Sequence, residues 1–254
     1  MTSGFIEDSL KAHRYMSEHN YGLAIEIYNN ILSGDKANKE ALLNAGNCYF
    51  HMKDLQNSEL CYRTLLLNDP SNYEAMNNLA SLLSLKRKKD ASLELYRRAT
   101  KHKDAGFEIW YNYGCVLADL GKFSEAKEAL ERSLNLSPTI ITYIKLSRLY
   151  ESYGYYSDAK QKAEEALRID PENTALLAQL GNICVKLNDM EKAKELYLKA
   201  LKINSALKIT WTNLGTIYSN ERDKEKAKMC YLRALNIDSE YSIAQENLNK
   251  LSAQ

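Results

Sequence analysis

The sequence predicts an all-α fold made of consecutive helical hairpins, and three regularities support this prediction. Small residues recur every 34 residues, and once after 33, in a column formed by Ala12, Gly46, Ala80, Gly114, Ser147, Gly181 and Gly215. A second small column has the same spacing: Ala24, Ser58, Ser92, Ala126, Ala159, Ala193 and Ala227. The three prolines, Pro70, Pro138 and Pro171, share one further position of this period. A fixed period of this length is typical of solenoids built from one repeated supersecondary unit.

Within each period, the apolar pattern predicts two helices joined by a short turn. In the fourth repeat, Trp110, Tyr113 and Leu117 recur at the spacing of one helix face. Gly121 marks a break, and a second helical run follows with Ser124 as its predicted N-cap. Where a proline is present it ends the second helix, because it lacks a backbone donor and clashes with the preceding turn. The small columns allow the two helices to approach closely.

Half of the 18 tyrosines belong to two further columns of the same period. The first-helix column contains Tyr15, Tyr49, Tyr150 and Tyr218, and the second-helix column contains Tyr28, Tyr62, Tyr96, Tyr197 and Tyr231. We therefore predict that these rings are packing residues of the hairpins and do not form a surface for stacking nucleic-acid bases.

The complete pattern resembles the tetratricopeptide repeat, in which Trp-x-x-Leu-Gly-x-x-Tyr is followed by Ala, an aromatic residue, Ala and Pro. The last repeat matches it at Trp211, Leu214, Gly215, Tyr218, Ala227, Tyr231 and Ala234, with Ser239 in place of Pro. The resemblance predicts one solenoid domain over 1–254, with seven helix-turn-helix repeats at 5–38, 39–72, 73–106, 107–139, 140–173, 174–207 and 208–241, and a C-terminal capping helix at 242–254. It implies a right-handed α-α superhelix whose first helices line a concave wall. Asp8 and Lys11 are expected to give the first repeat a polar outer face, as a terminal repeat needs.

Composition narrows the class of protein. The chain has 254 residues with 34 Lys and Arg against 33 Asp and Glu, so it lacks the basic excess of a dedicated nucleic-acid binder. No apolar run has the length of a signal peptide or a membrane span, which predicts a cytoplasmic protein without membrane insertion. The five cysteines, Cys48, Cys61, Cys115, Cys184 and Cys230, are too far apart for a zinc or redox motif, and we expect reduced, mostly buried thiols.

The sequence does not predict catalysis. The repeats occupy residues 5–241, and the Gly-rich phosphate-binding and zinc-protease motifs are absent. The four histidines, His13, His19, His51 and His102, are scattered and never share a helix face at metal-ligand spacing. We therefore predict a protein that is not an enzyme and uses no cofactor or metal.

One column of the first helices predicts a peptide-binding site. The position two residues before the first small column holds Leu10, Asn44, Asn78, Asn112, Lys145, Gln179 and Asn213, and Asn247 follows in the capping helix. An amide offers both a donor and an acceptor, so a row of amides pairs with a peptide backbone whatever its side chains. The column is similar to the asparagine ladder of the peptide-binding arrays in O-linked N-acetylglucosamine transferases. The alternative is that Asn is only a tolerated polar residue at this position.

Charged residues near this column predict some selectivity. Glu40, Glu74 and Glu108, with Asp119 nearby, make one part of the expected groove acidic, and Lys145 and Arg148 make the next part basic. Such a field orients a charged ligand, although a solvated face without a partner is the alternative. Ile6, Leu10 and His13 of the first repeat are candidates for an apolar end of the groove.

The family's chaperone-binding members clamp a C-terminal carboxylate with asparagines and three cations. The matching positions in this chain hold Leu43, Asn47, Asn78, Glu108 and Asn112. The asparagines are present, but the cations that a desolvated carboxylate requires are absent. We therefore predict that the protein has no carboxylate clamp.

These observations predict a non-catalytic adaptor or scaffold that binds an extended peptide or a partner helix. The predicted peptide-binding residues are Asn44, Asn78, Asn112, Lys145, Arg148, Gln179, Asn213 and Asn247. Two alternatives stay open: a homo-oligomer that assembles through head-to-tail solenoid contacts, and the substrate-recognition arm of a larger enzyme such as a glycosyltransferase. The initial Met and the capping helix favour a complete chain over such an arm.

Overall fold

The computed structural model describes residues 2–252, and these contain fifteen α-helices and no strand. The first eight helices are α1 (Thr2–Ser17), α2 (Tyr21–Gly34), α3 (Lys39–His51), α4 (Leu55–Asn68), α5 (Tyr73–Leu85), α6 (Lys89–Ala99), α7 (Phe107–Asp119) and α8 (Phe123–Leu136). The others are α9 (Ile140–Ser152), α10 (Tyr156–Ile169), α11 (Thr174–Lys186), α12 (Met190–Ile203), α13 (Lys208–Asn220), α14 (Lys224–Ile237) and α15 (Ser242–Ser252). The predicted all-α class is confirmed.

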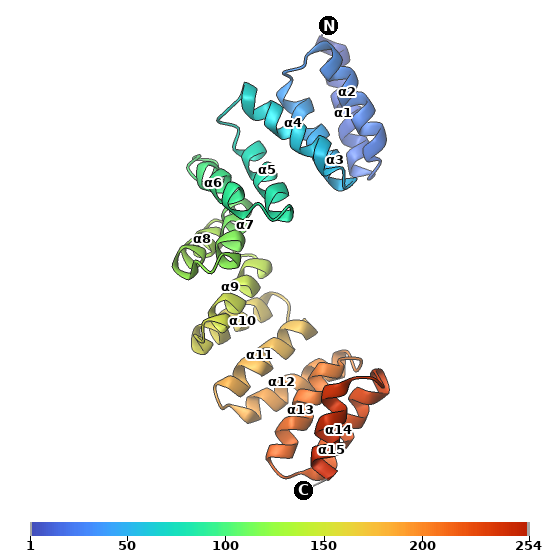
Figure 1. The fold of residues 1–254 in the computed structure, drawn as a ribbon, viewed down its shortest axis with the longest axis vertical. Helices are drawn as coiled ribbons and strands as arrows, with labels where there is room; N and C mark the ends of the chain where they lie inside the picture. Colours follow the sequence, from blue (N-terminus) through green and yellow to red (C-terminus); the bar gives the residue numbers. More distant parts are fainter. Residues whose placement is uncertain (1, 253–254) are drawn as a thin grey trace. The chain divides into compact units, whose positions relative to one another are not determined.

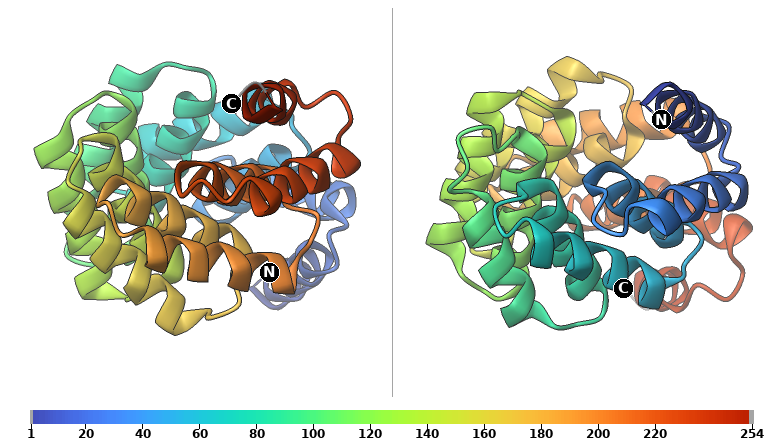
Figure 2. Two further views of the ribbon diagram at one scale, coloured as in Figure 1. Left: turned by 90° about the horizontal axis from the view of Figure 1, so that it is seen from below. Right: turned by 90° about the horizontal axis from the view of Figure 1, so that it is seen from above.

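The chain divides into two compact units, Met1–Ser137 and Pro138–Gln254 (Figure 1). Unit 1 holds α1–α8 and unit 2 holds α9–α15. Within each unit, successive helices form hairpins, and the second helix of each hairpin packs against the first helix of the next (Figures 1 and 2). The first helices α3, α5 and α7 of unit 1 also contact one another in turn. Helix α1 begins ahead of the predicted repeat start at residue 5, and positions 253–254 of the predicted capping helix lie outside the described residues.

The first small column is where a second helix presses on a first helix. A Cβ added to Gly46 would lie 2.5 Å from Cε1 of Tyr62, and one added to Gly215 would lie 2.7 Å from Cε1 of Tyr231. Contacts this short require the ring to move, so only a small residue fits at this crossing. The second small column faces the first one, since the Ser58 hydroxyl donates to the Gly46 carbonyl oxygen at 2.9 Å.

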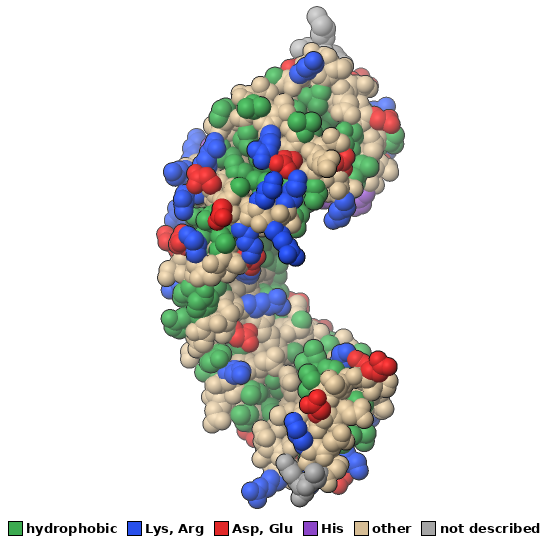
Figure 3. Space-filling model, viewed as in Figure 1, with side chains coloured by type: hydrophobic (Ala, Val, Ile, Leu, Met, Phe, Trp, Pro, Cys, Tyr) green, Lys and Arg blue, Asp and Glu red, His purple; other side chains and the backbone are tan. Residues whose placement is uncertain are grey.

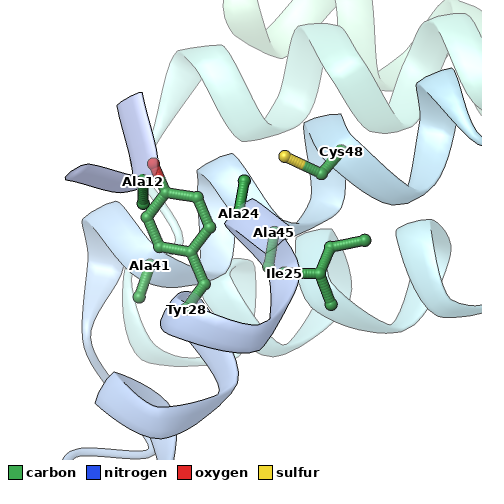
Figure 4. Close-up of a cluster of buried hydrophobic side chains, with 7 residues drawn as sticks. All are labelled: Ala12, Ala24, Ile25, Tyr28, Ala41, Ala45 and Cys48. Carbon is green, nitrogen blue, oxygen red and sulfur yellow. The ribbon is translucent and has the colours of Figure 1, made fainter. Parts of the chain in front are cut away.

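The tyrosines of the second helices form the centre of the hairpins. The exposed fraction of Tyr28, Tyr62, Tyr96, Tyr197 and Tyr231 is between 0% and 2%. In the first hairpin, the Tyr28 ring lies among small side chains of α1, α2 and α3 (Figure 4). Burying such a ring contributes a large share of the apolar area removed from water. These five tyrosines are packing residues, as predicted.

The ends of the helices only partly follow the prediction. Helices α4, α8 and α10 end two residues before Pro70, Pro138 and Pro171, as expected from the lost backbone donor. The predicted N-cap, Ser124, is wrong, because α8 begins at Phe123 and the N-cap residue is Lys122, which makes no side-chain cap. By contrast, an Asp side chain accepts a backbone N–H at the start of α4, α12 and α14.

Candidate functional site

The eight predicted peptide-binding residues lie on first helices or on the terminal helix. Asn44, Asn78 and Asn112 lie on α3, α5 and α7 of unit 1. In unit 2, Lys145 and Arg148 lie on α9, Gln179 on α11, Asn213 on α13 and Asn247 on α15. Arg148 is exposed and the other seven are half-buried, so their polar groups lie near the protein surface.

Two of these asparagines belong to a hydrogen-bond network that crosses four helices of unit 1, α3, α4, α5 and α7. Asn78 Nδ2 donates to Asn47 Oδ1 at 2.8 Å, and the Tyr62 hydroxyl donates to the same oxygen at 2.7 Å. Asn77 Nδ2 donates to Asn78 Oδ1 at 3.0 Å, and Asn112 Nδ2 donates to Asn77 Oδ1 at 3.2 Å. The amides therefore link α3 to α5 and α5 to α7, in addition to any role toward a ligand.

Unit 2 contains the same arrangement on α11, α12 and α13. The Tyr197 hydroxyl donates to Asn182 Oδ1 at 2.7 Å, and Asn213 Nδ2 donates to the same oxygen at 2.9 Å. Burial raises the pKa of Tyr197 to about 12, so its hydroxyl keeps its proton at neutral pH. Nearby, Gln179 Nε2 donates to Glu151 Oε2 at 3.1 Å and to Ser147 Oγ at 3.4 Å.

These networks contain three asparagines that are not among the predicted groove residues: Asn47, Asn77 and Asn182. The predicted groove used a single amide column, and Asn47 was considered only as a position of a carboxylate clamp. A usable signal was present, because Asn47 and Asn182 each precede a buried second-helix tyrosine by 15 residues.

The remaining predicted residues are not brought into these networks. Asn44 Nδ2 lies 3.1 Å from His13 Nε2, which makes a separate contact between α1 and α3. Within the described part of the chain, the Asn247 side chain has no hydrogen-bond partner and the Arg148 side chain has no ion-pair partner. Lys145 is half-buried on α9.

Each asparagine network borders a hollow in its own unit. The hollow in unit 1 has a volume of about 340 Å³, and four amides line it together with apolar and aromatic side chains: Asn47, Asn77, Asn78, Asn112, Met16, Phe50 and Tyr62. The hollow in unit 2 has a volume of about 320 Å³, and its lining includes Asn182, Asn213 and Tyr197. Side chains that accept and donate hydrogen bonds therefore surround a space large enough for part of a peptide.

The predicted acidic column is exposed, and two of its members line another hollow in unit 1. Glu74 and Glu108, together with Asp104, border a space of about 420 Å³ that also touches the asparagine network. Burial raises the pKa of Tyr73 in this wall, and the charges of Glu74 and Asp104 raise it further. Glu40 accepts a hydrogen bond from Ser9 and lies 3.8 Å from His13. Lys145 and Arg148 belong to unit 2, so the predicted charge order along one groove stays a prediction.

Charged residues also cover the outer surface of unit 1. On the face drawn in Figure 3, Lys and Arg side chains lie in groups with carboxylates interspersed among them. In unit 1, Glu59 on α4 lies 2.7 Å from Lys86, which follows α5, and 2.8 Å from Arg63 on α4. Ion pairs near water contribute little to stability.

The cysteine environments favour thiols that are poor nucleophiles. Burial raises the pKa of Cys48, Cys61 and Cys230 to about 11, so these thiols are protonated at neutral pH. In the described range 2–252, no group of three or more His, Cys, Asp or Glu side chains is placed to hold a metal ion. Nor is any helix in that range both long and apolar enough to cross a membrane.

Comparison with known proteins relates the helical pattern to one family. Models described as "Tetratricopeptide repeat" match residues 15–83, 107–140, 152–206 and 210–241. The BBSome complex member BBS4 of Bos taurus is 29% identical over 142 residues, which are 56% of this chain and 27% of that protein. The tetratricopeptide repeat-containing protein trd-1 of Caenorhabditis elegans is 30% identical over 94 residues, or 37% of this chain and 12% of that one. This chain therefore spans about a quarter or less of these relatives.

Solved structures show the same fold at low sequence identity. The C-terminal part of a TPR repeat-containing protein from Cytophaga hutchinsonii has a TM-score of 0.79 at 16% identity, covering 94% of this chain and 99% of that one. The type IV pilus biogenesis factor PilW has a TM-score of 0.72 at 22% identity, covering 84% and 97% of the two chains. At these identities the likeness concerns the fold.

Proposed function

Because the chain belongs to the tetratricopeptide-repeat family, we propose that it is a non-catalytic adaptor that holds an extended segment of a partner protein against its first helices. The observation that carries this proposal is the wall of four amides around the hollow in unit 1, formed by Asn47, Asn77, Asn78 and Asn112. Amides pair with both N–H and C=O groups of a backbone. Their bonds to one another leave each amide with further donor or acceptor capacity for a ligand.

The relatives favour a partner that is part of a larger assembly. Several of them are named as members of the BBSome complex, among them the proteins of Bos taurus and Mus musculus. A subunit of a complex needs surfaces for other proteins and no catalytic centre, which fits the present chain. We therefore propose that the ligand is a segment of another subunit, and that the protein acts as a scaffold without chemistry of its own.

The test is a variant in which Asn78, Asn112 and Asn213 are all replaced by alanine. We expect the variant to lose proteins that the wild type captures from a cell extract. Each lost amide also removes a half-buried hydrogen bond between helices, at a cost of about 0.5–1.5 kcal/mol each. Circular dichroism should show that the variant remains helical at the temperature of the capture.

Unchanged capture by the folded variant would contradict the proposal. Sedimentation of the purified wild type over a range of concentrations addresses the alternative of self-assembly. Association that grows with concentration and survives the triple substitution would favour the head-to-tail scaffold instead.

A further inference from the structure

We infer that the chain carries two separate sites for extended segments, one in each unit, and that the two sites prefer different ligand side chains. The inference rests on the proposed function, because it assumes that the amide-lined hollows hold peptide. It adds that one asparagine organises each site, Asn47 in unit 1 and Asn182 in unit 2.

The two sites have one construction. In each, a buried tyrosine located 15 residues after the central asparagine donates to its Oδ1 atom. In each, an asparagine located 31 residues after the central one donates to the same atom. The four distances lie between 2.7 and 2.9 Å. These are well-formed hydrogen bonds, so the central amide is held on two sides.

Two donors on one oxygen fix which way the central amide faces. Among the described residues, no hydrogen bond satisfies the side-chain nitrogen of Asn47 or of Asn182. Over the same residues, no buried side-chain nitrogen or oxygen lacks a partner, so both nitrogens must reach the surface. Each asparagine also lines its hollow. A donor group that is already oriented toward the space binds a ligand carbonyl without first losing side-chain entropy.

The equivalent positions in the neighbouring repeats do not reproduce this amide. They hold Ser81, Cys115, Arg148 and Thr216. The Ser81 hydroxyl is bonded to the Tyr96 hydroxyl at 2.6 Å, and Arg148 has no acceptor atom for a tyrosine. The repeats between the two sites therefore lack the pre-oriented amide, which separates the sites along the chain.

The rims of the two hollows differ at equivalent positions. Met16 and His51 line the hollow in unit 1, and the residues at the equivalent positions of the hollow in unit 2 are Glu151 and Lys186. Phe50 adds an aromatic ring in unit 1. The hollow in unit 2 also has apolar lining from Val185, Met190 and Ile217, so the two rims differ in charge. Unit 2 therefore fits a charged ligand side chain that pairs with Glu151 or Lys186, whereas no Asp, Glu, Lys or Arg side chain of the described residues lines the hollow in unit 1. One chain can then hold two different segments at once.

The substitutions Asn47→Asp and Asn182→Asp test this inference with little change in shape. A carboxylate keeps the oxygen that accepts from the tyrosine and the second asparagine, but it replaces the outward N–H groups by an acceptor that repels a ligand carbonyl. Asn29→Asp on α2 and Asn249→Asp on α15 are the matched controls, because both asparagines are exposed and neither lines a hollow described above. Thermal melting followed by circular dichroism checks that all four variants fold.

The probe is a phage-displayed library of random dodecapeptides, selected on the wild type, followed by calorimetry with the synthesised peptides. We expect two groups of peptides. Asn47→Asp should lower the affinity for one group of peptides by about tenfold or more and leave the affinity for the other group unchanged, and Asn182→Asp should do the reverse. The group that depends on Asn182 should contain more charged side chains than the group that depends on Asn47, and peptides of the two groups should bind one chain together.

Two results would overturn the two-site inference and favour a single groove. In the first, both variants lose affinity for the same peptides to the same extent. In the second, peptides of the two groups compete for binding to one chain. The proposed function would be overturned as well if the selection enriched no peptide. It would also be overturned if the peptides bound all four variants and the triple alanine variant as tightly as they bind the wild type. Loss of binding in the two control variants would show a charge effect and would also overturn the inference.

Discussion

A single atom decides how closely the two helices of a hairpin approach. At Gly215 the missing Cβ leaves space for the Tyr231 ring, which is 2% exposed. The same ring occupies the core of the hairpin, so the glycine and the tyrosine depend on each other. This dependence explains why small residues recur in the first column with the period of the fold.

We expect Gly215→Ala to destabilise the protein. The new Cβ would lie 2.7 Å from Tyr231 Cε1 and 3.1 Å from Cys230 Cβ, and overpacking of this kind costs about 1–3 kcal/mol. That cost exceeds the gain of about 1 kcal/mol in helix propensity. Urea unfolding measures the difference. Gly22→Ala is the control, because no atom lies within 4 Å of its added Cβ, and it should not destabilise the protein.

The candidate site shows how far single residues could be predicted from the sequence. The periodic amide column identified Asn78, Asn112 and Asn213 as polar positions on the first helices. Their partners lie one repeat earlier and outside the amide column, so the spacing within a helix does not connect them: Asn47, Asn77 and Asn182. Whether an amide faces a neighbouring repeat or a ligand depends on contacts between helices, which a single sequence does not record.

At the scale of elements, every hairpin turn contains one residue in the left-handed region. Gly121 and Gly154 have φ angles of 74° and 79°, and five other turns use His19, Lys53, Arg87, Asn188 and Arg222 with φ between 59° and 66°. The helices could be predicted because their apolar residues repeat at helical spacing. The common turn geometry could not, since three of the seven turns hold Lys or Arg at this position, and these residues do not favour the left-handed conformation.

Exchanging residues at these turns should change stability in opposite directions. Gly154→Ala adds a Cβ in open space at a left-handed position, so its cost is backbone strain of about 1–2 kcal/mol. Arg222→Gly removes such strain and should stabilise the protein. The gain should be smaller than the cost of Gly154→Ala, because glycine loses more conformational entropy on folding. Chemical denaturation measures both effects. Arg222→Ala keeps the strained conformation, and if it stabilises as much as Arg222→Gly, the backbone explanation is wrong.

At the scale of the whole molecule, stability is distributed over contacts between neighbours. Unit 2 has its own buried side chains on α9–α14, and α15 covers Tyr231 and Ala227 at its end with Leu251. In solenoids each repeat contacts only adjacent repeats, so total stability is close to a sum of local terms. A substitution inside one unit should therefore act independently of the other unit.

A fragment of residues 138–254 tests this locality. Because α10–α14 keep their neighbours and α15 covers the end, we expect a helical fragment that unfolds cooperatively in urea. Its free energy of unfolding should be lower than that of the full chain, since fewer repeats contribute. Gly215→Ala should nevertheless lower it by the same amount in both, within about 0.5 kcal/mol, because the substitution disturbs only α13 and α14. A clearly larger effect in the full chain would mean that stability at α13 depends on residues outside unit 2.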